Sequence, residues 1–431
     1  MPQVDSFLDA VERASGGTIA IELVNEWRGA PGSEKGTIDD VANGAVDLAW
    51  VGTRAFDLTG ETALQALTAP LLVDSNELQQ AIIDSDLPAR MIDAVHIDGV
   101  ETLAILAGGL RRPFSVDGPL TNPSSFEGIS FQAFESALSS ETVRALGAQP
   151  TNSGSVTDGS FSGFEKQFST VMLNGTNVEA PYVAANVVLW PETIALVGSA
   201  ERLGKLTDRQ RAWIEQAAAE AAHNSVHKLP ADVANLAAFC AGGGRAGLAS
   251  ASDLAAFRAA VEPVYQRLRE DPITAGFLAD IDAIKAATAS TELAVPAGCT
   301  GVAVSASAVQ ASPDAAADAI DGVYRWELTA ADADAAGQRE DPRYPLPHVF
   351  TMTLADGRWS HHVRDAKQEA DYGGGRFTVQ GQRLTLIWDH GGSMEFTFDV
   401  LPGGNLRVLP TASLIAEDAF VMTTHEWVRI G

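Results

Sequence analysis

Buried-type apolar runs alternate with amphipathic segments from residue 1 to about residue 295. Residues 45–51 are almost continuously apolar, interrupted only by Asp47, which is typical of a parallel strand covered on both faces. Residues 4–11 instead repeat apolar side chains at helical spacing, so they predict an amphipathic helix. The alternation of such strands and helices predicts a mixed α/β architecture with a largely parallel sheet.

The same patterns predict the other elements of this region, and two helices carry a capping residue at the expected place. Thr207 precedes one helix and Ser136 another, and each hydroxyl can accept a bond from an N-terminal amide. The other predicted strands are residues 18–24, 100–106, 114–116, 129–134 and 187–197. The predicted helices, including the two capped ones, are residues 33–43, 76–95, 137–146, 208–228, 252–268 and 273–289.

The pattern changes near residue 299. Residues 299–318 are rich in Ala and Ser and contain no aromatic side chain, so they predict a linker. Eight short β-rich runs follow, separated by turn signals such as Gly403-Gly404, and they predict an all-β barrel or sandwich. We therefore expect an α/β domain over residues 1–298, the linker, and an all-β domain over residues 319–431.

The chain is strongly acidic, with a formal charge of −27 from 56 acidic and 29 basic residues. Such a surface repels nucleic acids and anionic membranes, so neither is an expected partner. The sequence has no apolar run of about 18 residues, so no membrane-spanning helix is predicted. The first residues also lack the basic start and apolar core of an export signal.

Arg54 is the first candidate binding residue, because it follows the buried run that ends near Gly52. Ligands of open α/β sheets bind just outside the carboxyl ends of the strands. The position therefore indicates a small-molecule pocket with a cation, although an ion pair on the surface would explain the same residue.

Several segments carry a family resemblance: SGGTIAIEL at 15–23, VANGAVDLAWVGTRAFD at 41–57, ALTAPLLVDS at 66–75, NPSSFEGISFQAFES at 122–136 and NVVLWPE at 186–192. Taken together and in this order, they resemble the substrate-binding proteins of tripartite ATP-independent periplasmic (TRAP) transporters over residues 1–290. More narrowly, the chain resembles an actinobacterial-type branch with an extra C-terminal β domain. That domain is similar to a lipocalin-like barrel.

The resemblance implies a two-lobed periplasmic-binding-protein fold whose lobes close on a ligand in the cleft between them. The ligand would be a small organic molecule, usually a carboxylate, and the partners would be the membrane subunits of the transporter. No chemistry is done on the ligand, so the resemblance implies no enzyme, and we expect no cofactor. It also implies a monomer outside the cytoplasm, in the periplasm or at the cell surface, where the full-length protein could carry a lipid anchor.

Three features depart from the family pattern. Proteins of this kind begin with a β-strand before the helix predicted here at the N-terminus, and both that strand and the export signal are absent, so we expect a truncated N-terminus. The family also usually has an Arg, which grips the ligand carboxylate with two hydrogen bonds, where this chain has Gln132. A Gln can donate a hydrogen bond but carries no charge, which puts the usual carboxylate clamp in doubt.

The resemblance places further candidate residues in the cleft, and each also has an ordinary structural explanation. An arginine could pair with a surface carboxylate, an aromatic residue could belong to the core, and an asparagine could form part of a turn. The ligand-binding candidates are Arg54, Arg111, Phe131, Gln132, Asn174, Asn177, Asn186 and Trp190.

The two cysteines, Cys240 and Cys299, allow a disulfide without requiring one, and two buried thiols are the alternative. If the bridge forms, it closes a loop of about 60 residues and indicates an oxidising compartment. His223 and His227 have the helical spacing of two metal ligands, but a solvated helix face explains them better, so we expect no metal site.

The leading hypothesis is therefore an extracytoplasmic solute-binding protein that feeds a TRAP-type importer. The alternative is a transport-independent sensory or interaction protein that presents the β domain to a partner, which Gln132 and the added domain favour. An enzyme is disfavoured, because the sequence contains no nucleophile elbow, no phosphate loop and no other catalytic constellation.

Overall fold

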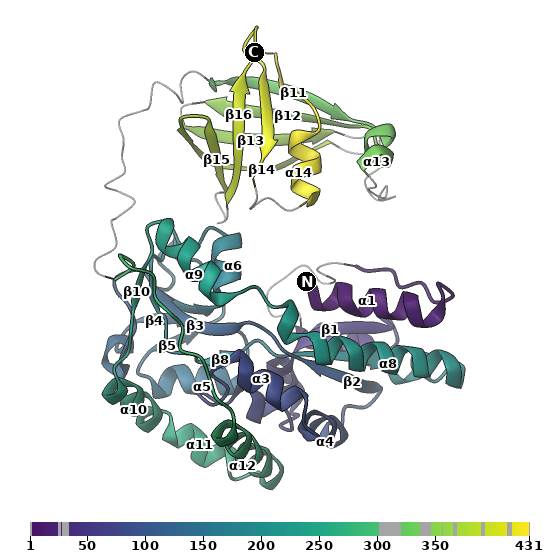
Figure 1. Ribbon diagram of the computed structural model, residues 1–431, viewed down its shortest axis with the longest axis vertical. Coiled ribbons are helices and arrows are strands. Elements are labelled where there is room, and N and C mark those ends of the chain that lie inside the picture. The colour runs from purple at the N-terminus through teal and green to yellow at the C-terminus, as the bar shows by residue number, and fades with distance from the viewer. Residues whose placement is uncertain are drawn as a thin grey trace. The chain divides into compact units, whose positions relative to one another are not determined.

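The computed structural model of the protein describes residues 2–24, 27, 34–300, 320–336, 346–355, 357–364, 369–388, 393–411 and 416–430 (Figure 1). The chain divides into two compact units, of which the first holds residues 1–171 and 177–303 and the second holds residues 172–176 and 304–431. The predicted linker at 299–318 falls outside the described residues except for 299 and 300. Among the described helices, none has both the length and the apolar character that crossing a membrane requires.

The first unit contains two sheets, each the centre of an α/β lobe (Figure 1). The first lobe has an antiparallel sheet in the order β1 (Leu48–Gly52), β9 (Ile194–Ser199), β2 (Val100–Leu106). The second lobe has a mixed sheet in the order β10-β7-β3-β6-β4-β5, with β8 paired to β3. Its strands are β3 (Leu110–Ser115), β4 (Ser130–Gln132), β5 (Gln149–Thr151), β6 (Gly163–Lys166), β7 (Tyr182–Ala184), β8 (Trp190–Pro191) and β10 (Arg245–Gly247).

Two of the crossings of the chain between the sheets lie next to each other, the one from β2 to β3 and the one from β8 to β9. The amide of Glu192 donates to the carbonyl of Gly109 at 2.9 Å and ties the two crossings together. A Cβ at Gly108 would lie 1.5 Å from the carbonyl oxygen of Glu192. Only glycine at 108 therefore lets the two crossing segments approach this closely.

Helices cover both faces of each sheet. In the first lobe, α1 (Pro2–Ser15) and α8 (Asp208–Asn224) lie side by side on one face, where Phe7 meets the ring of Trp50 edge-on at 5.3 Å (Figure 1). The other helices of this unit are α2 (Glu34–Ala42), α3 (Asn76–Ile83), α4 (Leu87–Ala94), α5 (Ala137–Ala145), α6 (Phe168–Leu173), α7 (Ala200–Leu203), α9 (Asp232–Ala241), α10 (Ala251–Ala260), α11 (Glu262–Leu268) and α12 (Pro272–Ala287).

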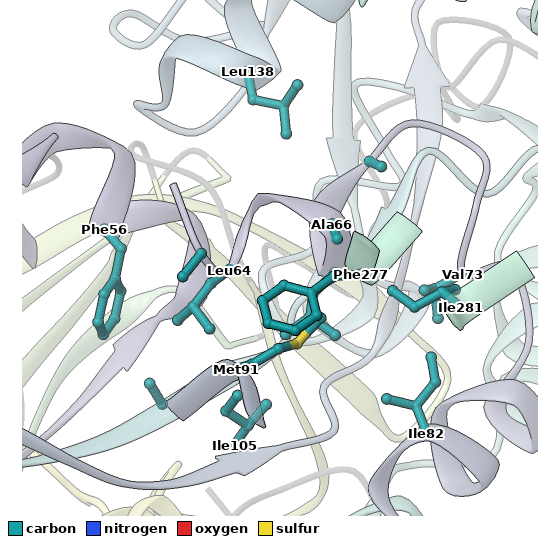
Figure 2. Packing of buried hydrophobic residues seen from close by; sticks show 14 of the residues in the cluster. Phe56, Leu64, Ala66, Val73, Ile82, Met91, Ile105, Leu138, Phe277 and Ile281 are labelled. Atoms are coloured by element: carbon teal, nitrogen blue, oxygen red, sulfur yellow. The ribbon is translucent and has the colours of Figure 1, made fainter. Parts of the chain in front are cut away.

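The opposite face of the first sheet is buried under segments from both ends of this unit. Phe56 and Leu64 come from the segment after β1, Met91 comes from α4, and Phe277 and Ile281 come from α12 (Figure 2). Since α12 packs into the core of the first lobe, the chain returns to the lobe from which it started. This return fixes the loop after β1 against a rigid core.

Several predicted elements are confirmed, and four predictions are corrected. The largely parallel sheet is wrong, as is the parallel pairing expected for residues 45–51: β9 enters the first sheet from the second lobe and runs antiparallel to both β1 and β2, and the second sheet is mixed. Ser136 and Thr207 cap α5 and α8 as expected, each accepting a bond from the amide three residues later. The strand predicted at 18–24 is wrong, because Ile19–Val24 forms no backbone–backbone hydrogen bond within the described part of the chain. The helices predicted at 76–95 and 252–268 are each broken in two, with Pro88 and Pro263 in the first turn of the second helix.

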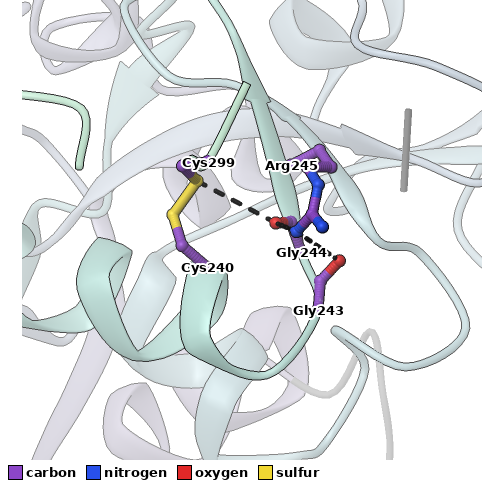
Figure 3. Close-up of a disulfide and its surroundings, with 5 residues drawn as sticks. All are labelled: Cys240, Gly243, Gly244, Arg245 and Cys299. Atoms are coloured by element: carbon purple, nitrogen blue, oxygen red, sulfur yellow. Dashed lines mark hydrogen bonds between the residues drawn. A yellow bond between two sulfur atoms is a disulfide. The ribbon is translucent and has the colours of Figure 1, made fainter. Parts of the chain in front are cut away.

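Cys240 and Cys299 form a disulfide, which the sequence allowed but did not require (Figure 3). The bond joins the end of α9 to the segment before residue 300, with the two Cα atoms 5.2 Å apart. The amide of Ala246 in β10 donates to the carbonyl of Cys299 at 2.8 Å. The last described residues of the first unit are thus fixed to its second lobe.

The second unit is an eight-stranded antiparallel sheet in the order β17-β16-β15-β14-β13-β12-β11-β18. Leu406 and Trp427 exchange two backbone hydrogen bonds of 3.0 and 2.8 Å, which join β17 to the residue before β18 and close a barrel. Of the two predicted architectures the barrel is therefore the one found. Its strands are β11 (Gly322–Leu328), β12 (His348–Ala355), β13 (Arg358–Arg364), β14 (Glu369–Gln380), β15 (Arg383–Trp388), β16 (Ser393–Val400), β17 (Leu406–Pro410) and β18 (Val428–Arg429), with α13 (Ala330–Ala336) and α14 (Ala416–Thr423) between strands.

Stacked aromatic rings fill part of the barrel interior. The ring of Trp326 stacks on Trp427 at 4.9 Å and on Phe350 at 5.3 Å between centroids. His361 stacks beside both Trp326 and Phe350 and is 7% exposed. These tryptophans therefore belong to the core, since small barrels are filled by their own side chains.

Candidate functional site

Arg54 lies where the sequence placed it, directly after β1 in a 3-10 turn (Thr53–Thr59). Its side chain folds back over Gly52, where an added Cβ would lie 2.2 Å from the Nη1 atom. Glycine at this position thus makes room for the guanidinium group. The side chain is only 5% exposed, although it carries a full charge.

Arg54 and Arg111 meet at the crossings between the two lobes. Glu192, which lies between β8 and β9, accepts a hydrogen bond from Arg54 Nη1 with one carboxylate oxygen and from Arg111 Nη1 with the other. Arg54 comes from the first lobe and Arg111 from the first strand of the second lobe's sheet. One carboxylate therefore joins a cation from each lobe.

Two further carboxylates complete this group of charges. Glu34, at the start of α2, accepts from Arg54 Nη2 at 2.6 Å and from the amide of Gly52 at 2.8 Å. Glu165, in β6, accepts from Arg111 Nε and also binds the amide of Phe134 at 3.2 Å. We call Arg54, Arg111, Glu34, Glu165 and Glu192 the arginine cluster.

Phe134 covers both guanidinium groups of the arginine cluster. The centre of its ring lies 3.8 Å from Arg54 Cζ and 4.2 Å from Arg111 Cζ, which is a favourable cation–π geometry. The side chain is 40% exposed, an unusual position for a large apolar ring. Phe134 thus shields the faces of both guanidiniums and leaves only their edges for polar partners.

Burial and proximity shift the pKa values of this cluster. Burial, together with repulsion from Arg54, lowers the pKa of Arg111 to about 10, so Arg111 stays charged at neutral pH. Burial acts to raise the pKa of Glu192, but Arg111 and Arg54 outweigh it and hold that pKa below its ordinary value. Arg111 and Glu192 therefore face each other as a charged pair at neutral pH, and each arginine of the cluster has carboxylate partners.

Gln132 does not join the arginine cluster. It pairs in parallel register with Phe164, so the two side chains lie on the same sheet face. Glu165 follows Phe164 and points to the other face, where it binds Arg111. Phe131 also points away from Gln132, into the core between β4 and α10, where it is fully buried.

The remaining candidates lie apart from the arginine cluster. Asn186 exchanges two hydrogen bonds of 2.8 Å with the backbone of Ala249, so its amide is already used. Trp190 is 1% exposed, and its Nε1 has no partner among the described residues. Asn177 is buried beside Gly242 at the end of α9, and Asn174 makes no hydrogen bond within the described part of the chain.

Sequence reasoning found the two arginines but missed Glu34, Glu165, Glu192 and Phe134. Glu192 is the last residue of the NVVLWPE segment and Phe134 lies in SFQAFES, so both were inside segments that carried the resemblance. Nothing in the sequence indicated which carboxylates pair with the arginines. No group of three or more potential metal ligands occurs among the described residues.

Comparison with known proteins agrees with this architecture. The family model for bacterial extracellular solute-binding proteins, family 7 (DctP), matches residues 2–271. A TRAP periplasmic solute-binding protein from Chromohalobacter salexigens with bound D-glucuronate is 19% identical, with a TM-score of 0.57 over 65% of this chain and 94% of that one.

Two further solved structures are similar to the same extent. A TRAP periplasmic solute-binding protein from Ralstonia eutropha with bound (S)-2-acetolactate is 19% identical, with a TM-score of 0.59 over 66% of this chain and 94% of that one. One from Bradyrhizobium with bound D-galacturonate is 21% identical, with a TM-score of 0.57 over 65% and 95%. These likenesses confirm the predicted two-lobed fold, and with the family match over residues 2–271 they show that the chain belongs to the bacterial extracellular solute-binding proteins of family 7, the TRAP transporter type.

Proposed function

We propose that the protein captures a small organic carboxylate outside the cytoplasm and delivers it to the membrane subunits of a TRAP-type secondary importer. The observation that carries the proposal is the meeting of Arg54 and Arg111, one from each lobe, at the crossings between the sheets. Two cations held at the junction of two lobes suit a ligand that binds both lobes through a carboxylate. The ligands of the similar structures, D-glucuronate, D-galacturonate and acetolactate, are all carboxylates.

Other features support the location and the mode of action. The Cys240–Cys299 disulfide suits an oxidising compartment outside the cytoplasm. The described residues hold a closely packed charge network rather than a nucleophile with its base, so we propose binding without chemical conversion and a monomer as the working state. The proposed binding residues are Arg54 and Arg111, while the other sequence candidates stay predictions.

A thermal-shift panel tests the proposed function. We expect uronates, hydroxy acids or keto acids to raise the melting temperature of the first unit, because a ligand at a hundred times its Kd stabilises by about 2.7 kcal/mol. The matched amides or alcohols of the same compounds should give no shift. Stabilisation by neutral sugars alone, or by no member of the panel, would overturn the proposal.

One observation favours the alternative function as a sensory or interaction protein. The barrel of residues 320–430 lies outside residues 2–271, the part of the chain that matches the family. A transport role needs no such addition, whereas a protein that signals to a partner could use it. Deletion of the membrane-subunit genes distinguishes the two, since it abolishes uptake in the first case and leaves the phenotype unchanged in the second.

A further inference from the structure

Arg54 has one edge that its present partners use only in part. The Nε and Nη2 groups of a guanidinium lie side by side and can hold both oxygens of one carboxylate. In this protein Nη2 donates to Glu34 at 2.6 Å, whereas Nε is buried and has no hydrogen-bond partner among the described residues. A charged group that is 5% exposed thus keeps an unused donor on the edge best suited to a carboxylate.

The reason for this incomplete pairing is visible in the contacts of Glu34. Its Oε2 atom binds Arg54, but its Oε1 atom is held by the amide of Gly52 at 2.8 Å. Because each oxygen has a different partner, Glu34 cannot turn both oxygens toward the guanidinium. An unsatisfied buried donor is destabilising, so a ligand that binds both Nε and Nη2 gains the hydrogen bond that Glu34 leaves unmade.

The other partners of Arg54 leave no second edge available. Nη1 binds Glu192, whose side chain is 14% exposed and also holds Arg111. The ring of Phe134 covers one face of the guanidinium at 3.8 Å. A ligand can therefore reach Arg54 in the plane of the guanidinium, along the edge that Glu34 occupies.

Glu34 is also the carboxylate of the cluster that is easiest to displace. Its side chain is 34% exposed, against 14% for Glu192 and 0% for Glu165. Displacing Glu165 or Glu192 would break a buried ion pair with Arg111, which is strongly destabilising, whereas Glu34 can move into solvent. If Glu34 leaves and a ligand carboxylate takes its place, two arginines still face three carboxylates, so the local charge balance is kept.

We propose that the Nε–Nη2 edge of Arg54 is the receptor for the ligand's carboxylate, and that Glu34 is a placeholder that the ligand displaces. The inference rests on the proposed function and gives it a specific site. Arg54 would supply a two-pronged carboxylate clamp from the first lobe. Gln132 in the second lobe cannot form such a clamp. Glu34 then sets the affinity, because every carboxylate ligand must compete with it.

Binding measurements on four proteins test the inference by titration calorimetry. The probe is whichever carboxylate stabilises the wild type in the panel, together with its amide. We expect Glu34→Gln to bind the carboxylate roughly tenfold more tightly, a gain of about 1.4 kcal/mol. Arg54→Lys keeps the charge but loses the two parallel donors of the guanidinium, so its affinity for the carboxylate should fall by roughly tenfold or more. Glu201→Gln removes the same charge from an exposed pair with Lys205 and should change nothing.

Nuclear magnetic resonance of the arginine Nε–H groups gives a second readout with acetate as the probe. The Arg54 signal is identified by its loss in Arg54→Lys. This signal should shift on addition of acetate and then saturate. Saturation in Glu34→Gln should need roughly a tenth of the acetate concentration that the wild type needs, which again corresponds to about 1.4 kcal/mol.

The two proposals fail in different ways. If a panel carboxylate binds the wild type but Glu34→Gln binds it equally or less tightly, or if acetate leaves the Nε–H signal unmoved in both proteins, the placeholder role is wrong and the function stands. If the Nε–H signal responds to acetate but no organic acid stabilises the protein, the receptor stands and the proposed function is wrong.

Discussion

Removing the disulfide by Cys240→Ser together with Cys299→Ser should destabilise the first unit by about 4 kcal/mol. The two cysteines are 59 residues apart in the sequence, and the chain-entropy model assigns about 4 kcal/mol to closing a loop of that length. A unit of roughly 300 residues has an unfolding entropy of about 0.6 kcal/mol per degree at its midpoint, so the midpoint should fall by about 6 °C.

Differential scanning calorimetry of the full chain can isolate this effect, because the barrel provides an internal reference. The transition of the first unit should move down, while the transition of the barrel, which contains neither cysteine, should stay in place. Dithiothreitol should lower the wild-type transition similarly and leave the double variant unchanged. A shift of under about 2 °C, or an equal shift in both transitions, would refute the reasoning, since either result means that the bridge does not constrain the unfolded first unit.

Three further predictions concern single side chains. Gly52→Ala puts a Cβ 2.2 Å from Arg54 Nη1 and should push the guanidinium away, so carboxylate affinity in a calorimetric titration should drop about tenfold while the circular dichroism spectrum is kept. Asp57 binds the hydroxyl of Ser136 at 2.7 Å at the start of α5, so Asp57→Ala should cost about 1–3 kcal/mol in urea unfolding, and an unchanged midpoint would contradict this. Burial and then the neighbouring His362 lower the pKa of His361 to about 4 from 6.5. The unfolded chain therefore binds this proton more readily than the folded barrel, and the barrel should lose up to about 3 kcal/mol of stability as pH falls from 6.5 to 4. His361→Phe should remove that acid sensitivity, and an unchanged pH profile would exclude this histidine as its source.

Hydrophobic periodicity predicted most of the fold, because each lobe buries its strands on both faces. Residues 45–51 and 100–106 appear as β1 and β2, and the caps at Ser136 and Thr207 were predicted correctly. The prediction failed where the outcome depends on a partner elsewhere in the chain. Residues 18–24 have strand-like residues but no neighbouring backbone to pair with among the described residues, and periodicity cannot report that absence.

The candidate site was predicted only in part, for a related reason. Arg54 could be found because it follows a strand at the edge where ligands bind, and Arg111 because the family resemblance placed it in the cleft. Arg54 is 20 residues from Glu34 and 138 from Glu192, and Arg111 is 54 residues from Glu165 and 81 from Glu192. No local spacing in the sequence therefore connects the arginines with their carboxylate partners. The placement of Gln132 on the other sheet face follows from pairing register, which sequence alone does not determine.

The bridge between Leu406 and Trp427 has a consequence for the solubility of the second unit. By joining β17 to the end of the chain, it leaves the eight described strands without a long unpaired edge that another molecule could extend by β-pairing. A chain shortened at Glu426 would lose this seam, the Trp427 ring that stacks on Trp326, and the β18 pairing with β11. Such a truncation should open the barrel and leave the edges of β17 and β11 unpaired, which favours aggregation through β-pairing, so Trp427 and β18 keep the barrel closed.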